Sequence, residues 1–169
     1  MEATESTSRK NAKGSGAPRL GHVHLKVRNL NRALEFYHDL LGLEITELVA
    51  GKYAFLSSGS AHHEVALQAL GNEGVSPLPY SVGLYHAAFE VETAEELLRV
   101  WKSIRNHGHR LNAVNHGISW ALYLEDPDGN GVEIYLDRRR SSGGREFWNG
   151  VVEQLTMAEV ERETGVVRV

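Results

Sequence analysis

The chain has 169 residues, of which 41% are hydrophobic and 24% charged, so it can bury the core of one domain or of two fused half-domains. Its net charge of −4 gives no electrostatic reason to expect nucleic acid as a partner, and no apolar run reaches membrane-spanning length. Cysteine is absent, which excludes disulfides, thiolate metal sites and cysteine nucleophiles and fits the cytoplasmic location that we expect.

The two ends of the chain differ in composition from its centre. Residues 1–18 are small and polar, lack the apolar segment of a signal peptide, and are predicted to form a disordered arm. Residues 19–138 are predicted to form the ordered domain. Residues 139–169 are predicted to form a tail with a short helix, which begins at the capping box Thr156-Met157-Ala158-Glu159 and ends near Gly165.

The centre of the sequence contains one pattern twice, in Gly21–Gly42 and in Tyr85–Gly108. When His22 is aligned with His86, apolar positions coincide, and each segment changes from the alternation of a strand to helical spacing. In the first copy, Asn29 is the expected N-cap of the helix and Gly42 its end. In the second copy, Thr93 to Glu96 form an expected capping box, and Gly108 ends the helix.

Three extended segments follow each helix. They are residues 43–49, 52–57 and 64–70 in the first half, and 110–115, 118–125 and 131–137 in the second. Asp126-Pro127-Asp128-Gly129 is a strong turn signal between the last two. We therefore predict an α+β fold of two βαβββ modules, at about residues 20–70 and 83–138, which pair into a curved, partly closed sheet around a metal cavity.

Strand alternation selects the candidate metal ligands. His22 and His24 lie opposite Val23 and Leu25, His86 holds the position equivalent to His22, and Glu133 faces away from the apolar side of the last strand. A single histidine of this kind is more often a polar residue bonded to backbone. The repeated pair with a strand carboxylate favours a metal, and two imidazoles with one carboxylate suit Fe(II) with open coordination positions. His24 remains a competitor, although it aligns with an alanine.

Further polar side chains share this predicted face. Tyr123 could hydrogen-bond a substrate, or it could be a core ring with its hydroxyl at the surface. Glu64 aligns with Glu133 in the repeat and could be a fourth ligand. The histidines of His62-His63-Glu64 precede an apolar run, but strict alternation would point His63 at the packing side unless the strand begins after it or a bulge follows it.

A longer pattern resembles a known family. Val114-Asn115-His116, followed by Leu122-Tyr123, Asp126-Pro127, Gly129 and Glu133, resembles the signature of type I extradiol ring-cleaving catechol dioxygenases. These enzymes belong to the vicinal oxygen chelate (glyoxalase/bleomycin resistance/dioxygenase) superfamily, whose opening module is similar to the stretch that begins at Gly21. The resemblance covers residues 20–137, and the chain is most similar to the smaller one-domain members.

The resemblance implies a function and a set of roles. It implies Fe(II), with Mn(II) as the alternative, and as partners a small aromatic diol and O2; we also expect a homo-oligomer. The implied metal ligands are His22, His86 and Glu133. The implied catalytic residues are His63 as the acid–base group, with His62 as its less essential neighbour, and His116 and Tyr123 as the substrate-binding pair.

Two other functions remain open from the sequence. A glyoxalase I-like or epimerase-type lyase or isomerase would use His22, Glu64, His86 and Glu133 as metal ligands, with a carboxylate as base. A metal-free drug-binding resistance protein is the third alternative, which the repeated histidines and Glu133 disfavour.

Overall fold

The structure is a computed structural model that describes residues 18–78 and 80–165. The predicted arm lies outside the described residues except for Pro18. The elements of the first half are β1 (Val23–Val27), α1 (Leu30–Leu34), the π-helical turn η1 (Glu35–Leu40), β2 (Glu44–Val49), β3 (Tyr53–Ser57) and β4 (Val65–Ala69). After the short helix η2 (Gly71–Glu73), the second half contains β5 (Ala87–Val91), α2 (Ala94–Asn106), β6 (Asn112–Asn115), β7 (Ser119–Glu125) and β8 (Gly131–Asp137), and then β9 (Glu153–Gln154) and α3 (Met157–Glu163).

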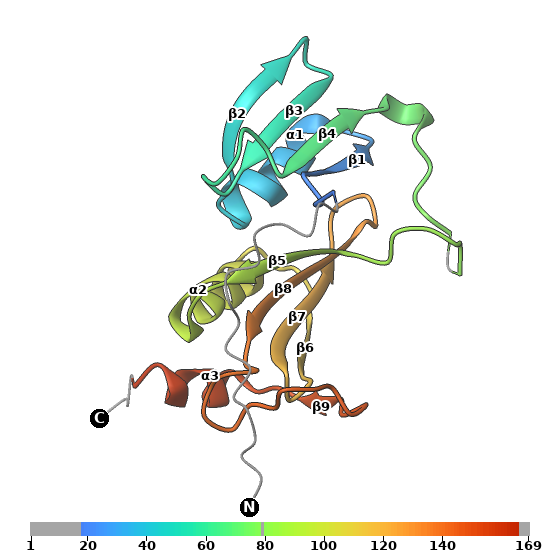
Figure 1. Cartoon of the computed structure of the whole chain (residues 1–169). Helices are drawn as coiled ribbons and strands as arrows, with labels where there is room; N and C mark the ends of the chain where they lie inside the picture. Colours follow the sequence, from blue (N-terminus) through green and yellow to red (C-terminus); the bar gives the residue numbers. More distant parts are fainter. Residues whose placement is uncertain (1–17, 79, 166–169) are drawn as a thin grey trace, which may run out of the picture.

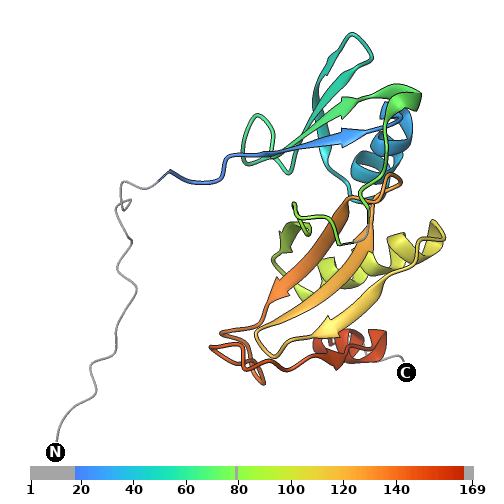
Figure 2. The same ribbon diagram turned by 90° about the vertical axis from the view of Figure 1, so that its right-hand side faces the viewer.

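The strands form two sheets, one of four strands and one of five, and the first four strands of each have the same connectivity. Their orders are β1-β4-β3-β2 and β5-β8-β7-β6-β9, and in each sheet the first pair is parallel and the others are antiparallel. This arrangement confirms the α+β class and the two βαβββ modules. The modules lie one above the other, and the sheets remain separate rather than closing into a barrel (Figures 1 and 2).

Each sheet packs one face against its helix and leaves polar side chains on the other. In β1, Leu25 and Val27 are buried, whereas His24 and Lys26 are exposed. The alternation along β8 is the same, because its apolar residues are buried and Glu133 is only partly covered. The apolar residues of both modules belong to one continuous core, in which the ring of Phe36 also contacts that of His109 at 5.4 Å.

The helix ends follow the sequence signals with two differences. Asn29 caps α1 by accepting a hydrogen bond from the Arg32 amide, and Thr156 and Glu159 complete the capping box of α3. Thr93 caps α2, but the Glu96 carboxylate accepts from the Glu92 amide, so that predicted box is not reciprocal. The first helix also widens into η1 before it ends, which the sequence pattern did not predict.

The turn between β7 and β8 joins the two modules. It is the predicted Asp126–Gly129 turn, and both of its carboxylates are buried. Asp126 accepts a hydrogen bond from the Tyr37 hydroxyl at 3.1 Å, and Asp128 accepts from the amide and from Nε of Arg28, each at 2.8 Å. Buried charges are stable only when they are paired in this way, so the turn fixes the first module against the second.

None of the described helices has the length and apolar character needed to cross a membrane.

Candidate functional site

His86 and Glu133 lie in contact in the second module. His86 directly precedes β5, and Glu133 is paired with Ala88 across the parallel β5–β8 ladder. A Cβ atom at Gly131 would lie 2.1 Å from the carbonyl oxygen of Tyr85, so a glycine is needed for the chain before His86 to approach β8. The His86 Nε2 atom is 2.8 Å from Oε2 of Glu133, with side chains 26% and 12% exposed.

Tyr123 and His116 extend this contact. Tyr123 is directly opposite Glu133 on β7, and its hydroxyl donates to Oε1 of Glu133 at 2.8 Å. The His116 Nε2 atom is 3.0 Å from the same hydroxyl. Burial, and next the hydrogen bond to Glu133, hold the pKa of Tyr123 well above its ordinary value, so the hydroxyl stays protonated and acts as a donor. We call His86, Glu133, Tyr123 and His116 the second-module cluster.

The tail holds His116 in place. His116 lies in the β6–β7 turn, where its amide donates to the Ser119 carbonyl. Its Nδ1 atom is 3.4 Å from the carbonyl oxygen of Val151, and its ring meets that of Trp148 edge-on at 6.2 Å. Trp148 was not among the predicted site residues, because its only signal in the sequence is an aromatic residue in a polar tail.

His22 and His63 form a second group, in the first module. Their ring centres are 4.6 Å apart, and the ring of Phe55 is 4.9 Å from that of His63. Because β4 begins only at Val65, strict alternation does not apply to His63, and its side chain lies beside His22. Burial, followed by the charges of His22 and His62, lowers the pKa of His63. We call His22 and His63 the first-module pair.

The two competing histidines, His24 and His62, make different contacts. The ring of His24 meets Tyr53 edge-on at 6.3 Å. His62 is exposed, with its Nε2 atom 3.8 Å from a carboxylate oxygen of Glu47. Its Nδ1 atom is 2.9 Å from Nδ1 of His63. When the Nδ1–H group of His63 donates in this contact, the Nε2 atom of His63 is the ring nitrogen that can receive a proton from a substrate.

The residues of one chain fit only part of the predicted metal site. Two ligands at right angles on one ion, each about 2.1 Å from it, lie about 3 Å apart, which agrees with the separation of His86 Nε2 and Glu133 Oε2. The Nδ1 atom of His86 is buried without a hydrogen-bond partner among the described residues. The chain does not bring His22 to this pair: within residues 18–78 and 80–165, no three His, Asp or Glu side chains are grouped closely enough to hold a metal ion.

Strand register corrects the predicted equivalence of Glu64 and Glu133. Val65 is opposite Val23 in the first sheet, and Val132 is opposite Ala87 in the second. Ala66 therefore holds the place in the first module that Glu133 holds in the second, and the alignment of Glu64 with Glu133 was wrong.

The Glu64 carboxylate is used locally. It accepts hydrogen bonds from the Ser58 amide, at 2.8 Å, and from the Ser60 hydroxyl. Burial raises the pKa of Glu64, but these hydrogen bonds outweigh it, so the net pKa lies below the ordinary value.

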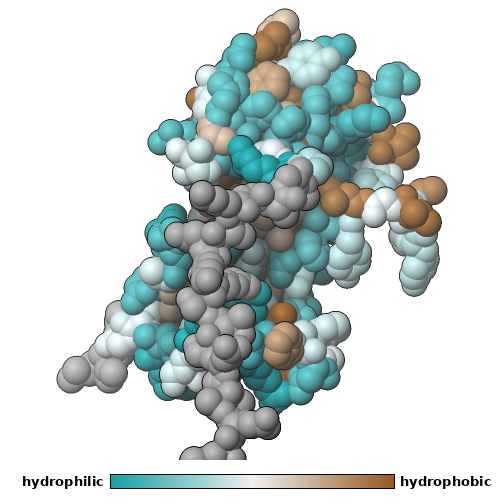
Figure 3. Space-filling model, in the orientation of Figure 1, coloured by the Kyte–Doolittle hydropathy of each residue, from teal (hydrophilic) through white to brown (hydrophobic). Residues whose placement is uncertain are grey.

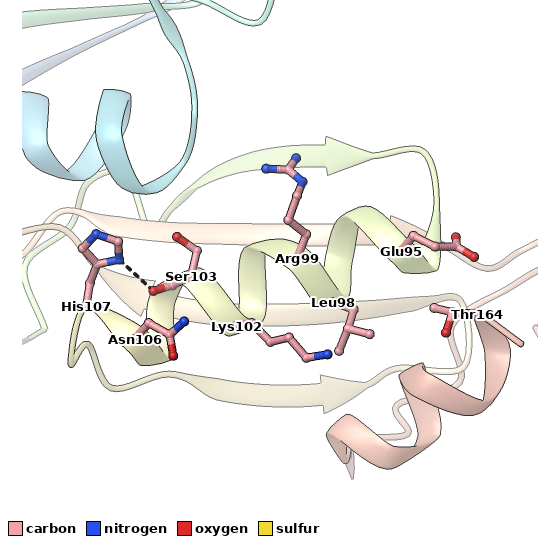
Figure 4. Close-up of a pocket in the computed structure, with 8 residues that line it drawn as sticks. All are labelled: Glu95, Leu98, Arg99, Lys102, Ser103, Asn106, His107 and Thr164. Carbon is pink, nitrogen blue, oxygen red and sulfur yellow. Dashed lines mark hydrogen bonds between the residues drawn. The ribbon is translucent and has the colours of Figure 1, made fainter. Parts of the chain in front are cut away.

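A hollow on α2 contains none of the predicted site residues. It lies along α2 and is bounded by Thr164, which follows α3 (Figure 4). Its floor is the aliphatic part of a charged helix surface, and Lys102 is paired there with Glu161 at 3.2 Å. Surface ion pairs of this kind are ordinary, so this hollow is not the candidate site.

A model of the Glyoxalase/Bleomycin resistance protein/Dioxygenase superfamily matches residues 19–134. The chain is 32% identical over 142 residues to catechol-2,3-dioxygenase of Bacillus subtilis (strain 168), which covers 84% of this chain and 50% of that protein. It is 34% identical over 122 residues to biphenyl-2,3-diol 1,2-dioxygenase 3 of Rhodococcus globerulus, covering 71% and 64%. The chain thus spans about half to two thirds of the length of these two relatives.

The chain is also similar to a lyase and to a solved structure of the same superfamily. Lactoylglutathione lyase of Escherichia coli O157:H7 is 28% identical over 134 residues, which is 74% of this chain and 97% of that protein. The crystal structure of a glyoxylase/bleomycin resistance protein/dioxygenase domain from Frankia sp. EAN1pec superposes with a TM-score of 0.61 at 23% identity, covering 75% of this chain and 97% of that one. The structural likeness concerns the fold.

Proposed function

The chain belongs to the glyoxalase/bleomycin resistance protein/dioxygenase superfamily, and we propose that it is an extradiol dioxygenase, which inserts O2 into a catechol-type diol next to its two hydroxyl groups. The observation that carries this proposal is the hydrogen-bonded series of His116, Tyr123, Glu133 and His86. The similarity to two ring-diol dioxygenases supports it.

The proposed metal ligands are His22, His86 and Glu133, of which the described part of the chain brings only His86 and Glu133 into contact. Two imidazoles and one carboxylate favour Fe(II), with Mn(II) as the alternative, and they leave positions open for more than one outside ligand. When bound, such an ion supplies electron exchange between a diol and O2. A ligand set of this kind has its carboxylate oriented by a neighbouring hydrogen bond. Tyr123 performs that task here, because it holds Oε1 of Glu133 and leaves Oε2 directed at His86.

The other residues of the chain bind the substrate and move protons. Tyr123 stays protonated and donates, so its oxygen receives a hydrogen bond from Nε2 of His116, and together they present a polar surface to a diol oxygen. His63 is proposed to take the proton of one diol hydroxyl at its Nε2 atom and to return it to an oxygen of the product. The ring of Phe55 beside His63 supplies an apolar contact for a flat substrate.

The glyoxalase-type alternative is favoured by the similarity to lactoylglutathione lyase. A four-ligand site of that kind needs a second strand carboxylate. The place equivalent to Glu133 is taken by Ala66, and Glu64 is engaged by a serine loop. These two observations support the dioxygenase over the lyase, and the histidines with Glu133 support both over metal-free drug binding.

The metal content of two variants tests the proposal. Wild-type protein loaded with Fe(II) without oxygen should hold one ion per chain. His86→Ala should hold none, because a ligand is lost, whereas Glu64→Gln, the matched control, should keep most of the metal. Full occupancy in His86→Ala would contradict the ligand assignment, and loss of the metal in Glu64→Gln would favour the lyase.

A further inference from the structure

We infer that the C-terminal tail takes part in substrate selection, with Trp148 as the contact for a second aromatic ring on the diol. This inference rests on the proposed function and says which diols the chain prefers, namely those that carry an aryl substituent rather than catechol itself. The superfamily match ends at residue 134, so Trp148 lies beyond the region that the family model covers.

The first observation is a series of neighbouring rings that crosses the second sheet. The ring centres of His86 and Tyr123 are 5.6 Å apart, and those of Tyr123 and His116 are 6.0 Å apart. The ring of Trp148 follows at 6.2 Å from that of His116. The series thus runs from the start of β5, through β7, to the edge at which the tail strand β9 joins β6. A substituent that extends from the diol along this series meets Trp148.

The second observation is that the tail holds the indole of Trp148 in one place. Its Nε1–H group donates to the Val151 carbonyl at 3.0 Å, and the same carbonyl oxygen is 3.4 Å from Nδ1 of His116. One backbone acceptor therefore fixes Trp148 and His116 relative to each other. A side chain that is ordered before binding loses little conformational entropy when a ligand arrives, so Trp148 is suited to act as a contact.

The segment that carries Trp148 is attached to the second module at both ends. Before Trp148, the Arg145 amide donates to the Gly117 carbonyl at 2.9 Å, in the β6–β7 turn. After it, β9 pairs with β6, and the side chains of Leu155 and Val160 are buried. Burial of these apolar groups stabilises the docked tail, so the position of Trp148 beside the second-module cluster belongs to the folded domain.

The third observation is that Trp148 is exposed although it is held in place. Its exposed fraction is 57%, whereas the other two tryptophans, Trp101 and Trp120, are only 6% and 8% exposed. Its N–H group already donates within the tail, so the surface that it offers to a ligand is apolar. Ligand sites combine such apolar surface with a few polar groups, which the second-module cluster supplies here.

The other end of the ring series lies beside the linker between the modules. Tyr85, the last residue of this linker, has its ring centre 5.2 Å from that of His86. Apolar side chains gather at the right edge in Figure 3, where Figure 1 places the linker. Those that are 65–105% exposed are Val75, Leu78, Tyr80, Val82, Leu84 and Tyr85. Exposed aromatic side chains therefore border the second-module cluster on both sides, as an aromatic ligand requires.

An aryl substituent gains a contact at Trp148 that catechol lacks. Aromatic pairs favour offset or edge-to-face contact with ring centres about 4.5–7 Å apart, and they contribute affinity beyond the area that they bury. The ring of catechol itself is engaged through its oxygens at the second-module cluster and has no second ring to place on the indole. Loss of the indole should therefore weaken the binding of an aryl diol and leave that of catechol unchanged.

Two probes that differ by one ring, catechol and 3-phenylcatechol, test the inference. Each is titrated without oxygen into Fe(II)-loaded protein by calorimetry, which gives Kd, and kcat/KM is then measured by oxygen uptake. For 3-phenylcatechol, Trp148→Ala should raise Kd and lower kcat/KM about tenfold, whereas for catechol both should change less than about twofold. Trp148→Phe, which retains a ring, should recover most of the loss.

Phe147→Ala is the matched control, because Phe147 is the adjacent aromatic residue of the same tail and is 76% exposed. It should leave both probes unchanged. Circular dichroism and metal content check each variant, and Trp148→Gln, which keeps a side-chain donor for the Val151 carbonyl, repeats the test if the alanine variant is unfolded. An equal loss for both diols in Trp148→Ala, or the same selective loss in Phe147→Ala, overturns the inference.

The outcomes separate this inference from the proposed function. A selective rise in Kd for 3-phenylcatechol in Trp148→Ala, with no oxygen uptake by the wild type, supports the tail contact and overturns the proposed reaction. Ring cleavage by the wild type, with both diols affected alike in Trp148→Ala, overturns the tail contact and leaves the dioxygenase proposal standing. Wild-type protein that binds neither diol overturns both.

Discussion

Tyr123 is the residue that links the proposed ligands to the proposed substrate contact. It donates to Glu133 and lies within hydrogen-bond distance of His116. Tyr123→Phe should therefore retain the fold and lower kcat about 10–100-fold, the usual effect of removing a partner that orients a ligand. Steady-state oxygen uptake with metal content measured in parallel checks this. Tyr135→Phe, which removes a hydroxyl bound to Glu90 on the same sheet, is the control and should change little.

His63 and His62 are adjacent in sequence but differ in surroundings. His63 lies beside His22 and Phe55, whereas His62 is exposed near Glu47. If His63 moves the proton, His63→Ala should keep the metal and turn over at least about 100 times more slowly, because placed acid–base groups contribute about 10²–10⁴-fold. His62→Ala should have a much smaller effect. The reverse order of the two variants in single-turnover assays would transfer the role to His62.

At this scale the sequence predicted which side chains face which side of a strand, but not what they touch. The alternation of β8 and β7 places Glu133 and Tyr123 on one face, as predicted. The orientation of His63 could not be predicted, because the alternation of side chains holds only within a strand and β4 begins at Val65. Glu64 was misaligned for a related reason. The repeat gives the spacing of residues along the chain, whereas the residue that corresponds to Glu133 depends on the register between β1 and β4.

Among the elements, the turn between β7 and β8 stabilises the contact between the two modules. The Tyr37 hydroxyl donates to Asp126, which also accepts from the Asn130 amide. Tyr37→Phe should lower the free energy of unfolding by about 1–2 kcal/mol, since a buried hydrogen bond to a carboxylate is lost while the ring remains. Urea unfolding measures this. Tyr53→Phe, whose hydroxyl accepts only a 3.3 Å bond from Gln68, is the matched control.

Tyr37 should also make the free energy of unfolding depend on pH. Burial, and then the charge of Asp126, raise the pKa of Tyr37 well above the ordinary value of 10.0. A group whose pKa is raised on folding stabilises the protein fully below its unfolded pKa and loses that contribution as the pH rises above it. Wild-type protein should thus lose more stability above pH 10 than Tyr37→Phe does. Parallel curves for the two proteins would contradict this.

The order and type of the strands and helices of the two βαβββ modules followed from the sequence, whereas η1, η2 and β9 were not predicted. The contacts that join the modules were not predicted either. Strand bounds agree within one or two residues, because alternation and turn residues are local signals. The turn itself was predicted as a link between two strands. Its second role, in which Asp128 binds Arg28, depends on a contact 100 residues apart that no local pattern encodes.

For the whole molecule, the repeat predicts two like modules but not whether they face each other in one chain. The described structure holds them side by side through buried carboxylates and a shared core. The predicted ligands therefore belong to two separate groups among the described residues.

Turnover of catechols by the metal-loaded protein tests the proposed dioxygenase activity most directly. Protein loaded with Fe(II) without oxygen is mixed with a panel of catechols, and O2 uptake is recorded together with the visible spectrum. At least one diol should yield a yellow ring-opened product with one O2 consumed per molecule, and His86→Ala should yield none. Turnover of a thiohemiacetal without oxygen uptake, with every diol left intact, would contradict the proposed activity.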